Sequence, residues 1–339
     1  MLTEHLPRVS LGFFPTPLEE MPRLTQFLGG PRLWIKRDDQ TGLATGGNKT
    51  RKLEFSVAEA LAQQADTLVT VGAVQSNHCR QTAAAATRHG LKCVLVIRGQ
   101  APESVTGNLL LDHLLGARIV FSGDRSREAV AEEVLAELKS SGAAPYFIPV
   151  GASNAIGAAG FVAGMEELYH QMEQGNLQAD RIVFASSSAG TQAGLCVGAK
   201  LLGFRGQITA IAIDSTREQL SQEVAHIAAG LIQRLRVKMA FSPEEVIAYD
   251  SYLGAGYSIM GAPEQEAIEL VARHEGILLD PVYTGRAMAG LIDLIRQGQF
   301  SRDENVIFWH TGGSAALYAY ANQLMGQSAP DCPSGKMSK

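Results

Sequence analysis

The sequence has few cysteines, and none of them are close together. Cys79, Cys93, Cys196 and Cys332 form no CxxC pair, whereas zinc sites and disulfide frameworks in small domains rely on closely spaced cysteines. We therefore expect reduced thiols in a cytoplasmic protein and no metal site.

Basic residues and long apolar runs are also scarce. Lys and Arg supply 29 residues and Asp and Glu supply 34, which gives a formal net charge of -5. A nucleic-acid-binding surface needs a concentrated basic face, so we expect no nucleic-acid partner. No apolar run is long enough to span a bilayer, and residues 1–10 lack the apolar core of a signal peptide. We therefore expect no membrane partner either.

Apolar residues, by contrast, make up 46% of the 339 residues, and charged residues make up 19%. This composition is typical of a globular protein with material for a large core. The chain is longer than one ordinary core supports, so we expect two lobes or one large α/β unit. Residues 326–339 are polar and rich in Pro, Gly and Ser, and we expect them to form a disordered tail.

Strand-like and helix-like segments alternate along most of the chain. Short apolar or β-branched runs predict strands, and apolar residues at helical spacing predict helices. The predicted strands are residues 32–36, 67–71, 93–97, 118–121, 146–149, 181–185, 208–213 and 305–308. The predicted helices are residues 48–63, 81–89, 108–115, 126–140, 158–172 and 192–202. This alternation implies βαβ crossovers, and hence an α/β fold with an open, twisted parallel sheet.

Ligands bind at the carboxyl ends of the strands in such sheets, and the first polar loop at such a place is residues 41–52. Gly46 and Gly47 permit a tight backbone path there. Asn48 stands where it can cap the following helix. Lys49 would lie in the first helical turn, where the helix dipole lowers its pKa, as a nucleophilic lysine requires. Taken alone, a surface lysine after a capped helix is the simpler interpretation.

A second loop, residues 73–80, follows a strand and opens a helix. Ser76, Asn77 and His78 offer hydrogen bonds there, and the free N–H groups of a helix start attract anions. A substrate carboxylate would fit this place. An ordinary helix cap made by Ser76 or Asn77 explains the pattern equally well.

A third loop, residues 185–194, reads ASSSAGTQAG and suits a phosphate held mainly by backbone N–H groups. It lacks the spacing of nucleotide-binding glycine motifs, so it suggests one phosphate. In a fourth loop, residues 308–314, Thr311 could give a hydroxyl to a ring nitrogen. The simpler alternative for the third loop is a plain connection between elements. For the fourth loop it is a helix start capped by the threonine.

Two tyrosines lie in turns that contain glycine or proline. Tyr257 stands in GAGYSIMG and Tyr283 in DPVYTG, and each read alone is more often a core residue. A lysine, a phosphate cradle and a hydroxyl for a pyridine nitrogen nevertheless fit one cofactor together, pyridoxal 5'-phosphate.

Five segments closely resemble the D-cysteine desulfhydrase and 1-aminocyclopropane-1-carboxylate (ACC) deaminase family: residues 46–55, 72–84, 188–195, 278–295 and 310–320. The resemblance runs from about residue 7 to residue 324. It implies a fold-type II pyridoxal-phosphate enzyme, related to tryptophan synthase β and usually a homodimer. It also implies two parallel-sheet domains, a larger cofactor-binding one (1–49 and 166–325) and a smaller one (50–165).

The resemblance also implies roles for individual residues. Lys49 matches the lysine that holds the cofactor covalently, and Lys52 matches a second lysine near the phosphate. Asn77 matches the partner of the pyridoxal 3'-oxygen, and Thr311 matches the residue facing the pyridine nitrogen. The family's phosphate-binding loop corresponds to four residues here: Ser188, Ala189, Gly190 and Thr191. The implied substrate-binding residues are Gln75, Ser76, Asn77, His78, Tyr257 and Tyr283. The implied catalytic residues are Lys49, Ser76, Tyr257 and Tyr283.

One position separates the branches of this family. ACC deaminases have a glutamate directly after the second tyrosine, and this chain has Thr284. The difference disfavours the deaminase and favours the D-cysteine desulfhydrase branch, with L-cysteate sulfo-lyase as an alternative. Residues 98–108 are also shorter than in many desulfhydrases, which leaves the leaving group open.

The predicted reaction is a β-elimination from a small cysteine-like amino acid. Lys49 or a tyrosine removes the α-proton, the β-substituent leaves as sulfide, sulfite or chloride, and pyruvate and ammonia result. The alternative from another class is an amino-acid- or phosphate-binding protein on the same fold, without catalysis.

Overall fold

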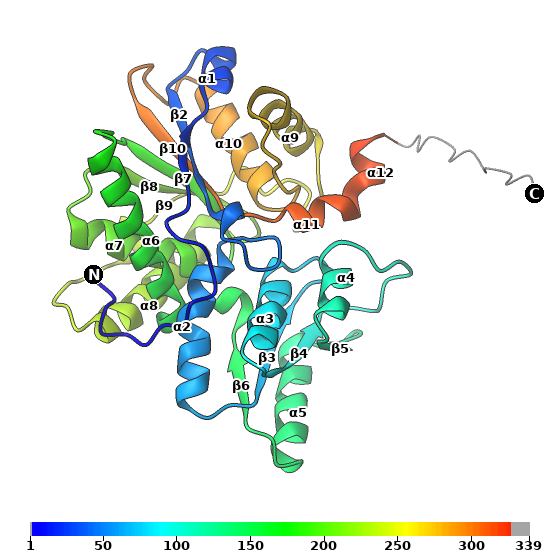
Figure 1. Cartoon of the computed structure of the whole chain (residues 1–339). Coiled ribbons are helices and arrows are strands. Elements are labelled where there is room, and N and C mark those ends of the chain that lie inside the picture. Colours follow the sequence, from blue (N-terminus) through cyan, green and yellow to red (C-terminus); the bar gives the residue numbers. More distant parts are fainter. Residues whose placement is uncertain (1, 327–339) are drawn as a thin grey trace, which may run out of the picture.

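The computed structural model describes residues 2–326 and contains two sheets flanked by helices (Figure 1). Strands in each sheet are parallel, apart from the antiparallel pair formed by the first two strands of the chain. The predicted α/β class with open parallel sheets is therefore confirmed. The predicted tail, residues 326–339, lies outside the described residues except for Gly326.

The larger sheet has six strands. In spatial order they are β1 (Leu18–Glu20), β2 (Arg32–Arg37), β10 (Asn305–His310), β7 (Arg181–Ser186), β8 (Gln207–Ala212) and β9 (Ile247–Tyr249). The last long strand of the chain, β10, thus inserts between β2 and β7. Because both of its neighbours are parallel to it, the three strands end together at one edge of the sheet.

Helices cover both faces of the larger sheet. Alternate residues of a strand point to opposite faces, so Ile182 and Phe184 of β7 pack in one core and Val183 and Ala185 in another. The first face is covered by α6 (Ala155–Gln174), α7 (Gly190–Leu202) and α8 (Arg217–Leu235). The second is covered by α1 (Pro22–Leu28), α9 (Ala262–Glu275) and α10 (Thr284–Arg296). The chain then ends its described part with α11 (Ser314–Leu317) and α12 (Ala321–Leu324).

The smaller sheet repeats this arrangement with four strands. They are β5 (Arg118–Phe121), β4 (Lys92–Ile97), β3 (Thr67–Gly72) and β6 (Pro145–Ile148). Leu68 and Leu95 pack on one face, beneath α2 (Lys49–Ala62) and α3 (Asn77–Arg88). Val69 and Val94 pack on the other face, against α5 (Arg127–Ser140), while α4 (Gly107–Leu114) packs against α3.

Helix α2 joins the two sheets. Its Leu53 and Val57 belong to the core of the smaller sheet, whereas Phe55 belongs to the core of the larger one. A Cβ on Gly160 of α6 would lie 2.2 Å from the carbonyl oxygen of Arg51, so the two helix backbones approach very closely. The predicted domain limits, 1–49 with 166–325 and 50–165, stay a prediction.

A buried ion cluster reinforces this junction. Arg51 of α2 donates hydrogen bonds to both oxygens of Asp38, at 2.8 and 2.9 Å, and to Glu167 of α6 at 2.9 Å. Lys36 of β2 also donates to Glu167. Glu167 is desolvated, but Arg51 and Lys36 outweigh this effect and lower its pKa to about 2.

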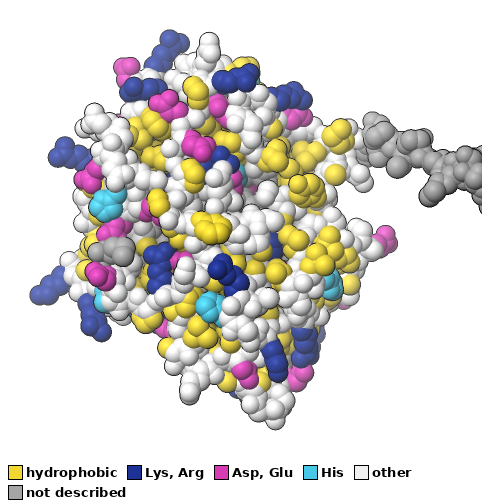
Figure 2. Space-filling model, in the orientation of Figure 1, with side chains coloured by type: hydrophobic (Ala, Val, Ile, Leu, Met, Phe, Trp, Pro, Cys, Tyr) yellow, Lys and Arg dark blue, Asp and Glu magenta, His cyan; other side chains and the backbone are white. Residues whose placement is uncertain are grey.

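Exposed apolar side chains gather on the right-hand side of the molecule in Figure 2. Helix α11 packs against α4, and Leu114, Tyr318 and Met325 are each at least 70% exposed. The homodimer implied by the family resemblance stays a prediction. Across residues 2–326, no helix combines the length and the apolar character needed to cross a membrane.

Candidate active site

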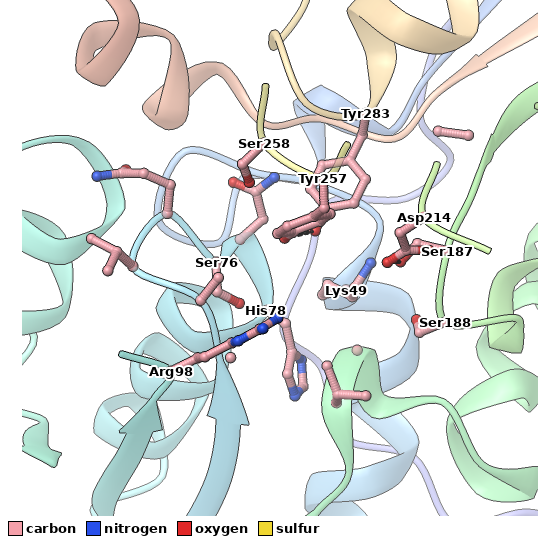
Figure 3. Close-up of a pocket in the computed structure, with 18 of the residues that line it drawn as sticks. Lys49, Ser76, His78, Arg98, Ser187, Ser188, Asp214, Tyr257, Ser258 and Tyr283 are labelled. Atoms are coloured by element: carbon pink, nitrogen blue, oxygen red, sulfur yellow. Dashed lines mark hydrogen bonds between the residues drawn. The ribbon is translucent and has the colours of Figure 1, made fainter. Parts of the chain in front are cut away.

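A cavity of about 740 Å³ opens where the carboxyl ends of both sheets meet. Residues that follow β3, β4, β7, β8 and β10 line it, together with the start of α2. All four loops singled out in the sequence contribute to its wall, and Lys49 lies at its centre (Figure 3). Crevices at the carboxyl ends of parallel strands are the usual ligand sites of such folds.

Lys49 begins α2, as predicted. Asn48 occupies the cap position, but the expected cap is wrong, because its side chain makes no capping bond. Instead the Asn48 amide accepts from Lys49 Nζ at 3.0 Å and donates to Thr191 Oγ1 at 3.2 Å. Burial lowers the pKa of Lys49 to about 8; the charge of Asp280 acts against this shift and that of Arg80 adds to it. Desolvation, rather than the predicted helix dipole, is therefore the main cause of the shift.

The loop between β7 and α7 forms a cradle. Ala189 has φ 62 and provides no side-chain cap for α7. The Gly190 N–H donates to the Ser188 carbonyl at 2.7 Å, but the N–H groups that follow it in the first turn have no capping side chain and can bind a ligand. A Cβ on Gly190 would lie 2.7 Å from Ser153 Oγ and 2.9 Å from Lys52 Nζ. Only glycine therefore leaves room between the helix start and these two polar groups.

Lys52 is a buried cation at this cradle. Its Nζ donates to the Gly151 carbonyl at 3.1 Å and to Ser153 Oγ at 3.0 Å, and the residue is 0% exposed. Burial lowers the pKa of Lys52 well below its usual value, and the nearby charge of Lys49 adds to this. No carboxylate within residues 2–326 forms an ion pair with it. Since buried charges are normally paired, the cradle has the features of an anion site.

Asn77 is oriented by two buried neighbours. Its Oδ1 accepts from Asn108 Nδ2 at 2.9 Å and from Arg80 Nη1 at 3.2 Å. Arg80 also donates to Asn108 Oδ1 at 2.6 Å and to the Gly46 carbonyl at 2.6 Å. Because the amide oxygen is occupied, Asn77 presents its NH₂ group, a donor, to the cavity that it lines.

Thr311 follows β10 and reaches the cavity from the other side. Its carbonyl accepts from Asn48 N at 2.9 Å, and no described residue bonds its hydroxyl. A Cβ on Gly312, where φ is 91, would lie 2.6 Å from Gly47 Cα, so two glycines let these loops pack together. The alternative of a Thr311 helix cap is wrong, because α11 begins only at Ser314.

Ser76 caps α3, as one reading of the sequence predicted, by accepting from Cys79 N at 3.2 Å. Its hydroxyl hydrogen is left for a second partner, and the residue lines the cavity. The neighbouring Gln75 amide is engaged elsewhere. It donates to the Thr106 carbonyl at 3.0 Å and accepts from Asn108 N at 2.8 Å. Gln75 thus holds the loop that follows β4.

His78 is directed into the protein. Its Nε2 lies 2.8 Å from Thr70 Oγ1, it is 3% exposed, and its ring points away from the two tyrosines (Figure 3). Burial lowers the pKa of His78 well below its usual value, and the charges of Lys49 and Lys52 add to this effect. The imidazole is therefore neutral at physiological pH.

Tyr257 and Tyr283 form a pair above Lys49. Their hydroxyl oxygens are 2.6 Å apart and their rings meet edge to face, with centroids 6.1 Å apart. Burial raises the pKa of Tyr283 well above its usual value, and burial also raises that of Tyr257. Both phenols stay protonated at neutral pH. Because one hydroxyl donates to the other, one hydrogen of the pair remains for a ligand.

Asp280 builds the turn that places Tyr283. Its Oδ2 accepts from Val282 N and Tyr283 N, and its Oδ1 accepts from the N–H and the hydroxyl of Thr284. The Thr284 hydroxyl oxygen in turn accepts from Asp280 N at 2.8 Å. The Thr284 side chain is fully buried in this turn. It offers no group to the cavity.

Several cavity residues were missed in the sequence: Arg98, Arg127, Ser187, Asp214, Ser258 and Tyr320. Arg98 directly follows β4, and Asp214 comes two residues after the end of β8. The rule that ligand sites lie at the carboxyl ends of strands could therefore have found both residues. Ser187 Oγ donates to Asp214 Oδ2 at 2.7 Å. Tyr320 donates to the Ser258 carbonyl at 2.8 Å, which no local pattern indicates.

Comparison with known proteins identifies the class. A family model described as pyridoxal-phosphate dependent enzyme matches residues 9–312. The chain therefore belongs to the family of pyridoxal-phosphate dependent enzymes, and it has the fold-type II architecture. The solved structure of an ACC deaminase homologue is 37% identical, with a TM-score of 0.88 over 96% of this chain and 97% of its own.

More distant structures share the fold. An L-serine ammonia-lyase from Rhizomucor miehei is 18% identical, with a TM-score of 0.69 over 94% of this chain and 99% of its own. A pyridoxal 5'-phosphate-dependent aspartate racemase is also 18% identical, with a TM-score of 0.65 over 88% of this chain and 90% of its own.

The cavity residues fit the family's cofactor. The cradle at the start of α7 has room where a Cβ would stand, and a buried cation without a carboxylate partner lies beside it. A phosphate supplies the missing negative charge. Lys49 has the lowered pKa that an attacking amine needs.

Proposed function

We propose that this chain is a pyridoxal-phosphate-dependent lyase that eliminates a β-substituent from a small amino acid. D-cysteine is the reference substrate: with one water it gives pyruvate, hydrogen sulfide and ammonia. The observation that carries the proposal is that Thr284, the residue after Tyr283, is buried and hydrogen-bonded to Asp280. Its hydroxyl is committed to Asp280, so the side chain after Tyr283 gives no carboxylate to the cavity.

The residues in and around the cavity would hold each functional group of pyridoxal phosphate. Lys49 would bond it covalently, and Lys52 with the Ser188–Thr191 loop would bind its phosphate. Asn77 would donate to the 3'-oxygen. Thr311 would offer a neutral hydroxyl to the pyridine nitrogen, which moderates electron withdrawal and favours elimination over transamination.

The geometry of the cavity also suggests which residues would bind and convert the substrate. The α-carboxylate would lie at the start of α3, where Ser76 can donate its hydroxyl hydrogen. When bound, pyridoxal phosphate stabilises negative charge at the α-carbon. Lys49, with a pKa of about 8, can take up the α-proton and return it. The tyrosine pair, with one hydrogen to spare, can supply a proton to the departing sulfur.

The test is a side-by-side assay of purified holoenzyme. D-cysteine, L-cysteine, L-cysteate and ACC are supplied separately, and pyruvate, α-ketobutyrate, sulfide and sulfite are measured. We expect pyruvate, and no α-ketobutyrate from ACC. Lys49→Ala should abolish turnover. Production of α-ketobutyrate from ACC as the main activity would establish the deaminase instead. Binding without any keto acid would support a non-catalytic binding protein.

A further inference from the structure

His310 is a buried histidine that the reaction described above does not use. It ends β10 and directly precedes Thr311, and it is 0% exposed. We propose that His310 is a positioning residue, which ties the Thr311 loop (residues 311–313) to the Tyr283 turn (residues 278–284). It thereby keeps the pyridine end of the cofactor site and the proton-donating tyrosine pair in one arrangement. The inference rests on the proposed place of Thr311, and it goes beyond the proposed function because it applies to any substrate.

The alternation of β10 decides where the imidazole points. Ile307 and Trp309 pack in the core covered by α6, α7 and α8, whereas Val306 and Phe308 pack in the core covered by α1, α9 and α10. Successive side chains of a strand point to opposite faces, so His310 continues the second series. Its ring therefore enters the face from which the chain returns after α9 toward the Tyr283 turn.

Both ring nitrogens of His310 are occupied, each by a different loop. Nδ1 accepts from Gly312 N at 3.2 Å, and Nε2 lies 3.1 Å from the Leu278 carbonyl oxygen. A backbone N–H only donates and a carbonyl only accepts, so the ring hydrogen is on Nε2. The Asp39 carboxylate is 4.0 Å from Nε2, beyond hydrogen-bond distance, and it bonds Arg37 instead. The imidazole thus uses its one donor and its one acceptor to join the Thr311 loop to the Tyr283 turn.

The Thr311 loop depends on this tether because it has few other attachments. Gly312 and Gly313 follow Thr311 and contribute no side chain that could hold the loop. No other acceptor within residues 2–326 bonds the Gly312 N–H, which is buried. A buried N–H without a partner is costly. The ring of His310 therefore fixes the backbone directly after the hydroxyl that faces the cavity.

The Tyr283 turn is in direct contact with the same loop. Leu278 stands two residues before Asp280, whose carboxylate builds the turn. A Cβ on Gly313 would lie 2.6 Å from Asp280 Cγ, so the loop and the turn pack without a gap. A displacement of one segment must move the other. The bond from the imidazole to Leu278 consequently links the place of Tyr283 to the place of the cofactor's ring.

Two variants separate the two halves of this link, because each keeps one polar atom of the imidazole. In His310→Asn the amide oxygen takes the place of Nδ1 and can still accept from Gly312 N. In His310→Gln the amide nitrogen takes the place of Nε2 and can still donate to the Leu278 carbonyl. The first variant keeps the Thr311 loop tethered, and the second keeps the Tyr283 turn tethered.

The two variants should differ in opposite ways. Titration with pyridoxal phosphate should show binding weakened about 3- to 10-fold in His310→Gln, where a buried N–H loses its acceptor. The visible absorbance maximum of the bound cofactor should also shift in that variant, and both properties should stay normal in His310→Asn. In cofactor-saturated enzyme, His310→Asn should lower kcat about tenfold, because Tyr283 is misplaced for proton transfer. His310→Gln should lower it less.

The control is Thr25→Val, which removes a comparable hydrogen bond far from the cavity. Thr25 Oγ1 accepts from Leu33 N at 2.9 Å, near the start of β2 and so at the sheet edge opposite the site. This change should lower the free energy of unfolding and leave cofactor affinity, absorbance and kcat unchanged.

Three results are decisive. If both His310 variants lose only stability, as Thr25→Val does, His310 has a purely structural role and the proposal is overturned. Equal losses of cofactor affinity and kcat in both variants would overturn it too, because the two bonds would then have no separate effects. If no substrate yields pyruvate, the lyase proposal fails, whereas the cofactor titration and the absorbance still test His310.

Discussion

Replacing Lys52 with methionine should act in opposite directions on cofactor binding and on the stability of the cofactor-free protein. Lys52 bonds only two neutral oxygens, at 3.0 and 3.1 Å, so its charge has no anion until a phosphate arrives. A charge-assisted hydrogen bond contributes about 1.5–3 kcal/mol. Its loss should weaken pyridoxal-phosphate binding by about 10- to 150-fold.

Without cofactor, the same substitution removes a buried amine whose charged form is disfavoured, because burial lowers its pKa and no anion pairs with it. We expect the free energy of unfolding to stay constant or to rise by about 1 kcal/mol, because apolar replacements of buried ions of similar volume are often neutral or stabilising. Cofactor titration monitored by visible absorbance measures the first effect, and urea unfolding of the cofactor-free protein measures the second. Lys139→Met, at an exposed position of α5, is the control.

Two results would refute this reasoning. Unchanged cofactor affinity would show that the phosphate does not use Lys52. A loss of about 3 kcal/mol or more in the cofactor-free protein would show that Lys52 has a structural partner, because that is the usual effect of breaking a buried ion pair.

Three further predictions follow from other groups. Cofactor incorporation into cofactor-free protein should speed up with pH and level off above about 8, the pKa of Lys49, whereas an ordinary lysine would level off only near 10.5; stopped-flow absorbance tests this. Gly190→Ala should weaken cofactor binding about tenfold or more, because the new methyl group would lie 2.9 Å from Lys52 Nζ; equilibrium dialysis tests this. Glu167→Gln should cost about 3 kcal/mol at pH 7. Because the pKa of Glu167 is lowered from 4.5 to about 2, this cost should fade as the pH drops through that interval, which urea unfolding at pH 7 and pH 3 measures.

Much of the fold could be predicted because most inner strands are short runs that are buried at all but their first residue. All eight predicted strands are present, with ends displaced by at most two residues. The same reasoning missed β1 and β9, which have three residues each and too short a pattern to read. Helix α3 begins at Asn77 rather than at the predicted residue 81, because the Ser76 cap starts it earlier than its alanine-rich stretch indicates.

The site was predictable where a residue follows a strand and bears a functional group, as with Lys49, Asn77 and Thr311. It was not predictable where packing decides what a side chain does. Gln75 holds a loop, and the ring of His78 turns inward to Thr70. No local pattern shows that an amide or an imidazole is already occupied, since the partners lie in other elements.

The hydrogen bond from Asn48 to Thr311 has a consequence for biosynthesis. It joins segments from opposite ends of the sequence, and β10 must insert between β2 and β7 before the bond can form. The smaller sheet is contiguous in sequence, from β3 to β6, and can fold on the ribosome early. The lysine is synthesised long before β10, so its surroundings are complete only after β10 has been made. A nascent chain that stops before β10 therefore carries Lys49 without the site that gives it its chemistry.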